Sequence, residues 1–229
     1  GSRSATTLAR TLGSLVAQSY PALAITFVQF HPVEGLDDLI AKVENRFRWI
    51  KTVVVPNNGN RGTSWWAGLN ASSAEYVAFL DDDDTLLPNH VESIMGVFDR
   101  KPEVGFVYTG LIRIQDEPGH YFWSPNFQGP RNQVIEERRE LLACSAEEFA
   151  DFSPLRNVIG NNAWICRRSV ITEEVLRDPR IELSEDVLFM ILMAGVTPFA
   201  FTGMATAEWH WRSTTKDNWS LSYPAQQIE

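Results

Sequence analysis

Four consecutive aspartates at residues 81–84 are the part of this chain best suited to chemistry. The apolar run before them, residues 76–80, predicts a buried strand, and Pro88 after them predicts the first turn of a helix. The carboxylates therefore leave the carboxyl end of a strand, where open α/β folds bind ligands. Clustered carboxylates repel one another unless a cation offsets their charge, and a hard divalent ion suits oxygen ligands. The alternative is an acidic surface turn that only ends the strand.

A second acidic group, Glu185 and Asp186, follows Ser184 and opens an apolar stretch that predicts a helix. A carboxylate in the first turn of a helix is stabilised in its ionised form by the helix dipole. The alternative is a capping sequence, with Ser184 as the cap and no role in chemistry.

His210 stands between two tryptophans near the end of the chain, and Arg212 and Lys216 follow it. Imidazole is a competent ligand for Mn²⁺, and a guanidinium suits the oxygens of a diphosphate. A histidine packed as a structural residue and a solvated surface beyond it are the alternatives. Residues 213–220 are expected to form either a mobile lid or ordinary surface.

The composition indicates one globular domain with a full core. The chain has 229 residues, 44% of them hydrophobic and 11% aromatic. A net charge of -9 argues against nucleic acid as a partner. Its two cysteines, Cys144 and Cys166, form neither a disulfide framework nor a metal cluster, and we expect buried thiols in a reducing, cytoplasmic compartment. No apolar run reaches membrane-spanning length.

Strands and helices alternate over the first half of the chain. We expect strands at 24–30, 52–56, 76–80 and 104–110, with helices from residue 4 to about 20 and at 36–47 and 63–73. This alternation predicts the α/β class with a mostly parallel central sheet flanked by helices. The second half is less regular: we expect short strands within 111–145, a short helix at 145–152, a strand from Ala163 and a helix that ends at Gly195.

Six segments together resemble the GT-A-fold glycosyltransferases of family 2, in the family's order and over nearly the whole chain. They are QSYP, AGLNASSAEYVAFLDDDD, VGFVYTG, NVIGNNAWICRRSVI, LSEDVLFMILMAG and EWHWRS. The resemblance implies a Rossmann-like GT-A fold with a smaller mixed region on the acceptor side. Residues 1–110 would bind a nucleotide sugar, and residues 111–229 would be the acceptor-binding and catalytic half of the same domain.

The family's Asp-x-Asp motif is matched by Asp81 and Asp83. The resemblance implies that Asp83, with Asp81, binds Mn²⁺ or Mg²⁺ together with the donor's diphosphate, and that His210 supplies a further ligand. Asp81 or Asp82 would face the ribose of the nucleotide. A metal stabilises a departing diphosphate without a proton, in accord with this assignment.

The Ser-Glu-Asp segment resembles the acidic pair of the family, whose aspartate is the general base. Asp186 would take the proton of an acceptor hydroxyl as it attacks the anomeric carbon, with inversion of configuration. Asn162 and Trp164, with Glu185, would line the acceptor site. The expected partners are a nucleotide-diphosphate sugar, with a UDP-sugar favoured, and a glycan or lipid-linked acceptor. Relatives that work on lipid-linked acceptors suggest peripheral association with the inner face of a membrane.

Three departures from the family pattern concern the donor. The apolar first strand of the family is missing before Arg3, so we expect either upstream residues in the whole protein or another segment in that place. The base-reading turn after the strand at 24–30 is replaced by Gln29, Phe30, His31 and Pro32. Ser-Trp-Trp replaces the usual Ala-Arg-Asn, which leaves Arg61 as the nearest substitute for a donor-binding arginine. Trp65 and Trp66, at the start of a predicted helix, are expected near the donor base.

Two other functions compete with glycosyl transfer. Asp81-x-Asp83-x-Thr85 also fits the opening motif of haloacid-dehalogenase-like Mg²⁺-dependent phosphatases, although that motif usually follows the first strand. The altered base-reading turns are also compatible with a non-catalytic module that only binds a nucleotide sugar. Intact Asp83 and Asp186 argue against the binding module.

Overall fold

The computed structural model describes residues 5–56, 61–115, 133–136, 139–142, 159–171, 176 and 185–211. Its first half contains α1 (Ala5–Val16), β1 (Ile25–Gln29), α2 (Leu36–Val43), the 3-10 helix η1 (Glu44–Arg46), β2 (Ile50–Val54), α3 (Arg61–Ala71), β3 (Tyr76–Val77), β4 (Thr85–Leu86) and α4 (His90–Arg100). Its second half contains β5 (Phe106–Gln115), β6 (Gln133–Glu136), β7 (Arg139–Leu142), β8 (Trp164–Arg167), η3 (Arg168–Val170), α7 (Glu185–Ala194) and β9 (Phe199–Trp211). The predicted α/β class is confirmed. The predicted helix at 145–152 lies outside the described residues.

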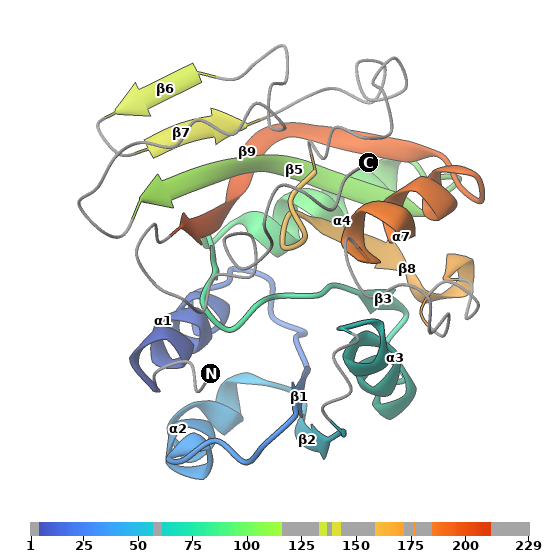
Figure 1. Ribbon diagram of the computed structural model, residues 1–229. Coiled ribbons are helices and arrows are strands. Elements are labelled where there is room, and N and C mark those ends of the chain that lie inside the picture. The colour runs from blue at the N-terminus through green and yellow to red at the C-terminus, as the bar shows by residue number, and fades with distance from the viewer. Residues whose placement is uncertain are drawn as a thin grey trace, which may run out of the picture.

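The strands form two sheets (Figure 1). β1 and β2 make a parallel pair, whereas the larger sheet runs β3-β8-β5-β7-β6, with β9 beside β5 and β4 beside β9. In that larger sheet only the β5–β9 pairing is parallel among the described strands. The sheet is therefore less parallel than we predicted from the alternating first half, because β6 and β7 form a hairpin and β8 runs against both of its neighbours.

The two sheets are separate: no pairing joins β1 or β2 to the larger sheet among the described strands. None of the described strands pairs with the second edge of β1 or of β3. β3 is also shorter than predicted, because its ladder with β8 contains only Tyr76 opposite Arg167 and Val77 opposite Cys166. Residue 110, the predicted boundary between the two halves, falls inside β5, so the halves share that strand.

Helices cover both faces of the larger sheet. Side chains alternate between the faces of a strand, so Phe106 and Val107 of β5 face opposite ways. Val107 packs with Ile94 and Phe98 of α4, whereas Phe106 packs with Phe189 of α7 and with α3. Figure 1 shows α4 and α7 against the long strands β5 and β9. None of the described helices is long and apolar enough to cross a membrane.

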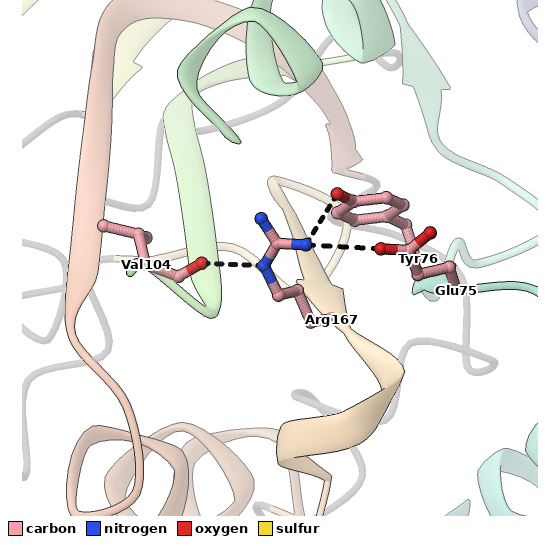
Figure 2. Close-up of polar contacts among 4 residues, drawn as sticks. All are labelled: Glu75, Tyr76, Val104 and Arg167. Carbon is pink, nitrogen blue, oxygen red and sulfur yellow. Dashed lines mark hydrogen bonds and ion pairs between the residues drawn. The ribbon is translucent and has the colours of Figure 1, made fainter. Parts of the chain in front are cut away.

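Arg167 joins the ends of three elements on the α4 side of the sheet (Figure 2). Its Nε donates to the carbonyl of Val104 at 3.1 Å, and its Nη1 donates to the hydroxyl of Tyr76 at 2.7 Å and to Glu75 at 3.3 Å. The guanidinium also lies 5.1 Å from the ring centroid of Phe98. Because Glu75 is mostly exposed, the ion pair contributes little, and the other contacts hold β3, β5 and α4 together.

His90, at the start of α4, is fully buried, and we expect it to make the stability of the fold sensitive to acid. Its Nδ1 lies 2.9 Å from the Thr206 hydroxyl, and burial lowers its pKa from 6.5 to about 4. Between these pH values His90 is protonated in the unfolded chain and neutral in the folded protein. The free energy of unfolding that this histidine contributes above pH 6.5 is therefore lost as the pH falls towards 4. The loss from this group should total about 3 kcal/mol.

Urea unfolding of wild type and His90→Gln at several pH values measures this loss. The free energy of unfolding of the variant should fall less over that range, whereas replacing the exposed His31 with glutamine should leave the wild-type slope. An unchanged slope in His90→Gln would mean that other groups cause the acid sensitivity.

Candidate functional site

Three of the four consecutive aspartates converge in a turn before β4. Carboxylate oxygens of Asp81, Asp83 and Asp84 all lie within 4.8 Å of one another, and the amide of Asp84 donates to the carbonyl of Asp81 at 3.3 Å. Asp84 is buried and the other two are half-buried. Three carboxylates at this spacing repel one another, and a divalent cation with a preference for oxygen would offset that repulsion. The donor set therefore fits Mg²⁺ or Mn²⁺.

Side chains of helix α1 hydrogen-bond to the main chain of this acidic turn. Arg10 donates to the carbonyl oxygen of Asp83 at 2.7 Å, and the hydroxyl of Thr11 donates to that of Asp84 at 2.7 Å. Both bonds use backbone oxygens and no carboxylate oxygen. They fix the shape of the turn, and so the spacing of its carboxylates, through the backbone.

The segment after α1 fixes the chain that follows the turn. Gln18 donates to the carbonyl of Leu87 at 2.8 Å and accepts from the amide of Val91 at 3.1 Å, and the amide of Ser19 donates to the carbonyl of Pro88 at 2.8 Å. In the sequence, Gln18 and Ser19 are notable only as part of the family-like segment QSYP. The structure gives them a role, which is to set where α4 begins relative to the acidic turn.

Strand β9 brings His210 to the same turn. The backbone amide of His210 donates to Oδ1 of Asp84 at 3.0 Å, and its ring Nε2 lies 2.8 Å from Oγ1 of Thr85. Thr85 also donates to Oε2 of Glu208 at 2.7 Å. His210 therefore lies beside the acidic turn although 126 residues separate it from Asp84.

The first turn of α7 carries Glu185, which is buried, and Asp186, which is half-buried. Oδ1 of Asp186 accepts from the amide of Val187 at 2.9 Å, while the predicted cap Ser184 lies outside the described residues. Asp186 shares a helix face with Phe189, three residues later. The ring of Phe189 is 6.4 Å from that of Phe79.

Phe79 precedes the acidic turn by two residues and packs in the same aromatic cluster as Phe189. Trp65 of α3 stacks on Phe79 at 4.3 Å and meets Phe189 edge-on at 5.7 Å. The acidic turn and the first turn of α7 therefore both extend from one packed cluster.

The two residues predicted to line the acceptor site, Asn162 and Trp164, differ in their surroundings. The amide of Asn162 is buried and donates to the carbonyl of Glu208 at 3.0 Å, which ties the loop before β8 to β9. The indole of Trp164 is fully buried between Phe106 and Phe189, at 5.0 and 5.3 Å. It offers no face to a sugar, so the predicted acceptor contact of Trp164 is corrected to a role in the core.

Asn161, in the loop before β8, was not among the predicted site residues. Both polar atoms of its side chain are buried, and neither has a hydrogen-bond partner within the part of the chain that the structure describes. Such groups are rare in folded proteins and call for an explanation. A neighbouring Asn162 was the only sequence signal for it.

The side chains of the two arginines predicted to bind the donor, Arg61 and Arg212, are not described by the structure. Arg61 begins α3, and its side chain is not among those described, while Arg212 and Lys216 lie beyond the described residues, as does the segment 213–220. Asp82 is half-buried and lies outside the converging group. Of the two tryptophans predicted near the nucleotide base, Trp65 is buried in the core and Trp66 is half-buried.

Comparison with solved structures identifies the architecture. Crystal structures of Staphylococcus aureus TarS superpose with TM-scores of 0.64 for a complex with UDP and 0.61 for a complex with UDP-GlcNAc, at 14% and 16% sequence identity. These comparisons cover 89% and 92% of this chain and 56% of each TarS chain. The fold is the GT-A fold of glycosyltransferases.

The sequence profile of glycosyl transferase family 2 matches residues 3–172, and the chain belongs to that family. A glucosyl-dolichyl phosphate glucuronosyltransferase of Haloferax volcanii is 25% identical over 66% of this chain and 45% of its own length. An uncharacterised glycosyltransferase of Nostoc is 30% identical over 44% of this chain and 31% of its own. The chain thus spans about half or less of the length of these relatives. Membership of this family decides against the phosphatase alternative.

Proposed function

We propose that this protein transfers a sugar from a nucleotide-diphosphate sugar to a hydroxyl group, with a divalent metal and with inversion at the anomeric carbon. The observation that carries the proposal is the convergence of Asp81, Asp83 and Asp84 within 4.8 Å beside His210. This turn shares an aromatic cluster with the helix that begins at Glu185 and Asp186.

The acidic turn would hold the cation. Asp83 and Asp81 are the proposed ligands, Asp84 joins them by its position, and His210 is the proposed nitrogen ligand. When bound, Mn²⁺ or Mg²⁺ would neutralise the charge that develops on the departing diphosphate. Asp81 and Asp82 are also proposed to face the ribose.

The diphosphate end of the donor is assigned to arginines. Arg61, at the start of α3, and Arg212, after β9, are the proposed partners of its oxygens. Both come from segments that follow a strand, where α/β folds bind their ligands. Residues 1–110 would accordingly hold most of the donor.

Asp186 is the proposed general base. Its place in the first turn of α7 favours the carboxylate form, which can accept the proton of the acceptor hydroxyl. The hydroxyl oxygen then forms the bond to the anomeric carbon as the bond to the diphosphate breaks on the opposite face. Glu185 and Asn162, both buried, are proposed to position the acceptor, within the half that spans residues 111–229.

The relatives suggest which substrates to test first. TarS crystallises with UDP and UDP-GlcNAc, and the Haloferax relative is named for a dolichyl phosphate substrate. We therefore propose a UDP-sugar donor and a glycan or lipid-linked acceptor, with the protein in the cytoplasm and peripheral to the inner face of a membrane.

A thermal-shift screen tests the donor half of this proposal. Uridine, guanosine and thymidine diphosphates are added with and without Mn²⁺, and UDP with Mn²⁺ should raise the melting temperature most. Hydrolysis of the matching nucleotide sugar is then measured. Stabilisation without any turnover would favour the binding-only module, and no response to any nucleotide with Mn²⁺ would contradict the proposal.

A further inference from the structure

The hydroxyl of Thr85 lies between the side chains of Glu208 and His210 and forms a hydrogen bond with each. Thr85 and Glu208 are directly opposite each other in the antiparallel pair β4–β9, and His210 lies two residues further along β9. Residues two apart on a strand share a face, so the side chains of Glu208 and His210 both reach Thr85. The hydroxyl oxygen of Thr85 lies 2.7 Å from Oε2 of Glu208 and 2.8 Å from Nε2 of His210.

The chemistry of these groups fixes which atom donates. A carboxylate only accepts hydrogen bonds, and a hydroxyl has one hydrogen to give. The hydrogen of Thr85 therefore goes to Glu208, and the oxygen of Thr85 must accept from Nε2–H of His210. A neutral imidazole with its proton on Nε2 carries its lone pair on Nδ1.

The surroundings hold this arrangement in place. Thr85 is 5% exposed, and Asn162, which is 4% exposed, donates to the backbone carbonyl of Glu208 at 3.0 Å. The amide of His210 is bonded to Oδ1 of Asp84 at 3.0 Å, so the backbone of the histidine cannot shift independently of the acidic turn. Because its backbone amide and its ring Nε2 are both hydrogen-bonded, the imidazole of His210 has little freedom to rotate.

We propose that Thr85 and Glu208 are positioning residues that hold His210 as the Nε2–H tautomer, so that it binds the divalent cation of the acidic turn through Nδ1. This inference rests on the proposed function, because it concerns the cation held there. Outer partners that fix the tautomer of a ligating histidine typically change metal affinity by about 10- to 100-fold when removed.

Two variants test the proposal in different ways. Thr85→Val keeps the shape of the side chain and removes the hydroxyl, so it should release the ring and weaken Mn²⁺ binding by about 10- to 100-fold. Glu208→Ala leaves the Thr85 hydrogen without its acceptor, so that hydrogen can turn to Nε2 and drive the ring to the Nδ1–H tautomer. Thr26→Val is the matched control, because the buried hydroxyl of Thr26 in β1 has no hydrogen-bond partner among the described residues.

The two readouts are the nitrogen-15 chemical shifts of the imidazole rings in metal-free protein and the dissociation constant of Mn²⁺ from electron paramagnetic resonance. The chain has four histidines, and the signal lost in His210→Gln identifies the ring of interest. In mildly alkaline buffer, where a typical imidazole is neutral, wild type and Thr26→Val should show Nε2–H and equal Mn²⁺ affinity. Glu208→Ala should show Nδ1–H, and Thr85→Val a mixture.

Different failures have different meanings. An Nδ1–H ring in wild type, or equal Mn²⁺ affinity in wild type and Thr85→Val, would overturn the positioning role and leave the proposed function standing. Absence of Mn²⁺ binding by wild type would overturn both the metal site of the proposed function and this inference.

Discussion

Replacing Asp186 with asparagine should lower the rate of sugar transfer by about 100- to 10,000-fold while nucleotide binding persists. Asparagine keeps the size of the side chain and its Oδ1 acceptor, so the bond from the amide of Val187 can remain. It removes the basic carboxylate that would take the proton of the acceptor hydroxyl. The measurements are transfer rates at saturating donor and the affinity for UDP in the presence of Mn²⁺.

The control for this variant is Asp37→Asn, which neutralises an exposed aspartate in the first turn of another helix, α2. It should leave both quantities close to the wild-type values, because only the charge at a helix start has changed. Near-normal transfer by Asp186→Asn would show that another group is the base.

Replacing Asp83 with alanine should weaken Mn²⁺ binding by on the order of 100-fold, because a charged ligand contributes at least as much as the outer partners of a site. Binding of UDP in the presence of Mn²⁺ should weaken in parallel. The fold should survive, since the bond from Arg10 to this residue uses the backbone oxygen, which alanine retains. Calorimetric titration of Mn²⁺ and then of UDP measures both effects.

Asp99→Ala, at an exposed aspartate near the end of α4, is the control and should bind both ligands as wild type does. If Asp83→Ala kept wild-type Mn²⁺ affinity, the cation would have to bind elsewhere. If it lost Mn²⁺ affinity but kept UDP affinity, the cation would not be the link to the diphosphate.

The order of the elements could be predicted because local patterns determine it. An apolar run, a turn and a proline placed the acidic residues before α4, and the apolar stretch after Asp186 predicted α7. Those patterns say which side chains are near one another along the chain. They do not say that Asp84 converges with Asp81 and Asp83 while Asp82 does not, because that depends on the geometry of the turn.

Contacts between segments far apart in the sequence could not be predicted from local sequence patterns. The approach of His210 to the acidic turn depends on the pairing of β9 with β4, and strand register depends on the whole sheet. Trp164 shows a related limit: an indole in an apolar strand suits a core or a sugar site equally. Its alternation with Ile165, which packs against α4, puts Trp164 on the face covered by α7.

A crystal structure of the protein with Mn²⁺ and UDP would show directly whether the acidic groups form one site. We predict the ion against the carboxylates of Asp83 and its neighbours in the acidic turn, the diphosphate on that ion, and the carboxylate of Asp186 facing the same cleft. An ion and diphosphate bound away from this turn, or Asp186 on a separate surface from them, would mean that these acidic groups do not form one site.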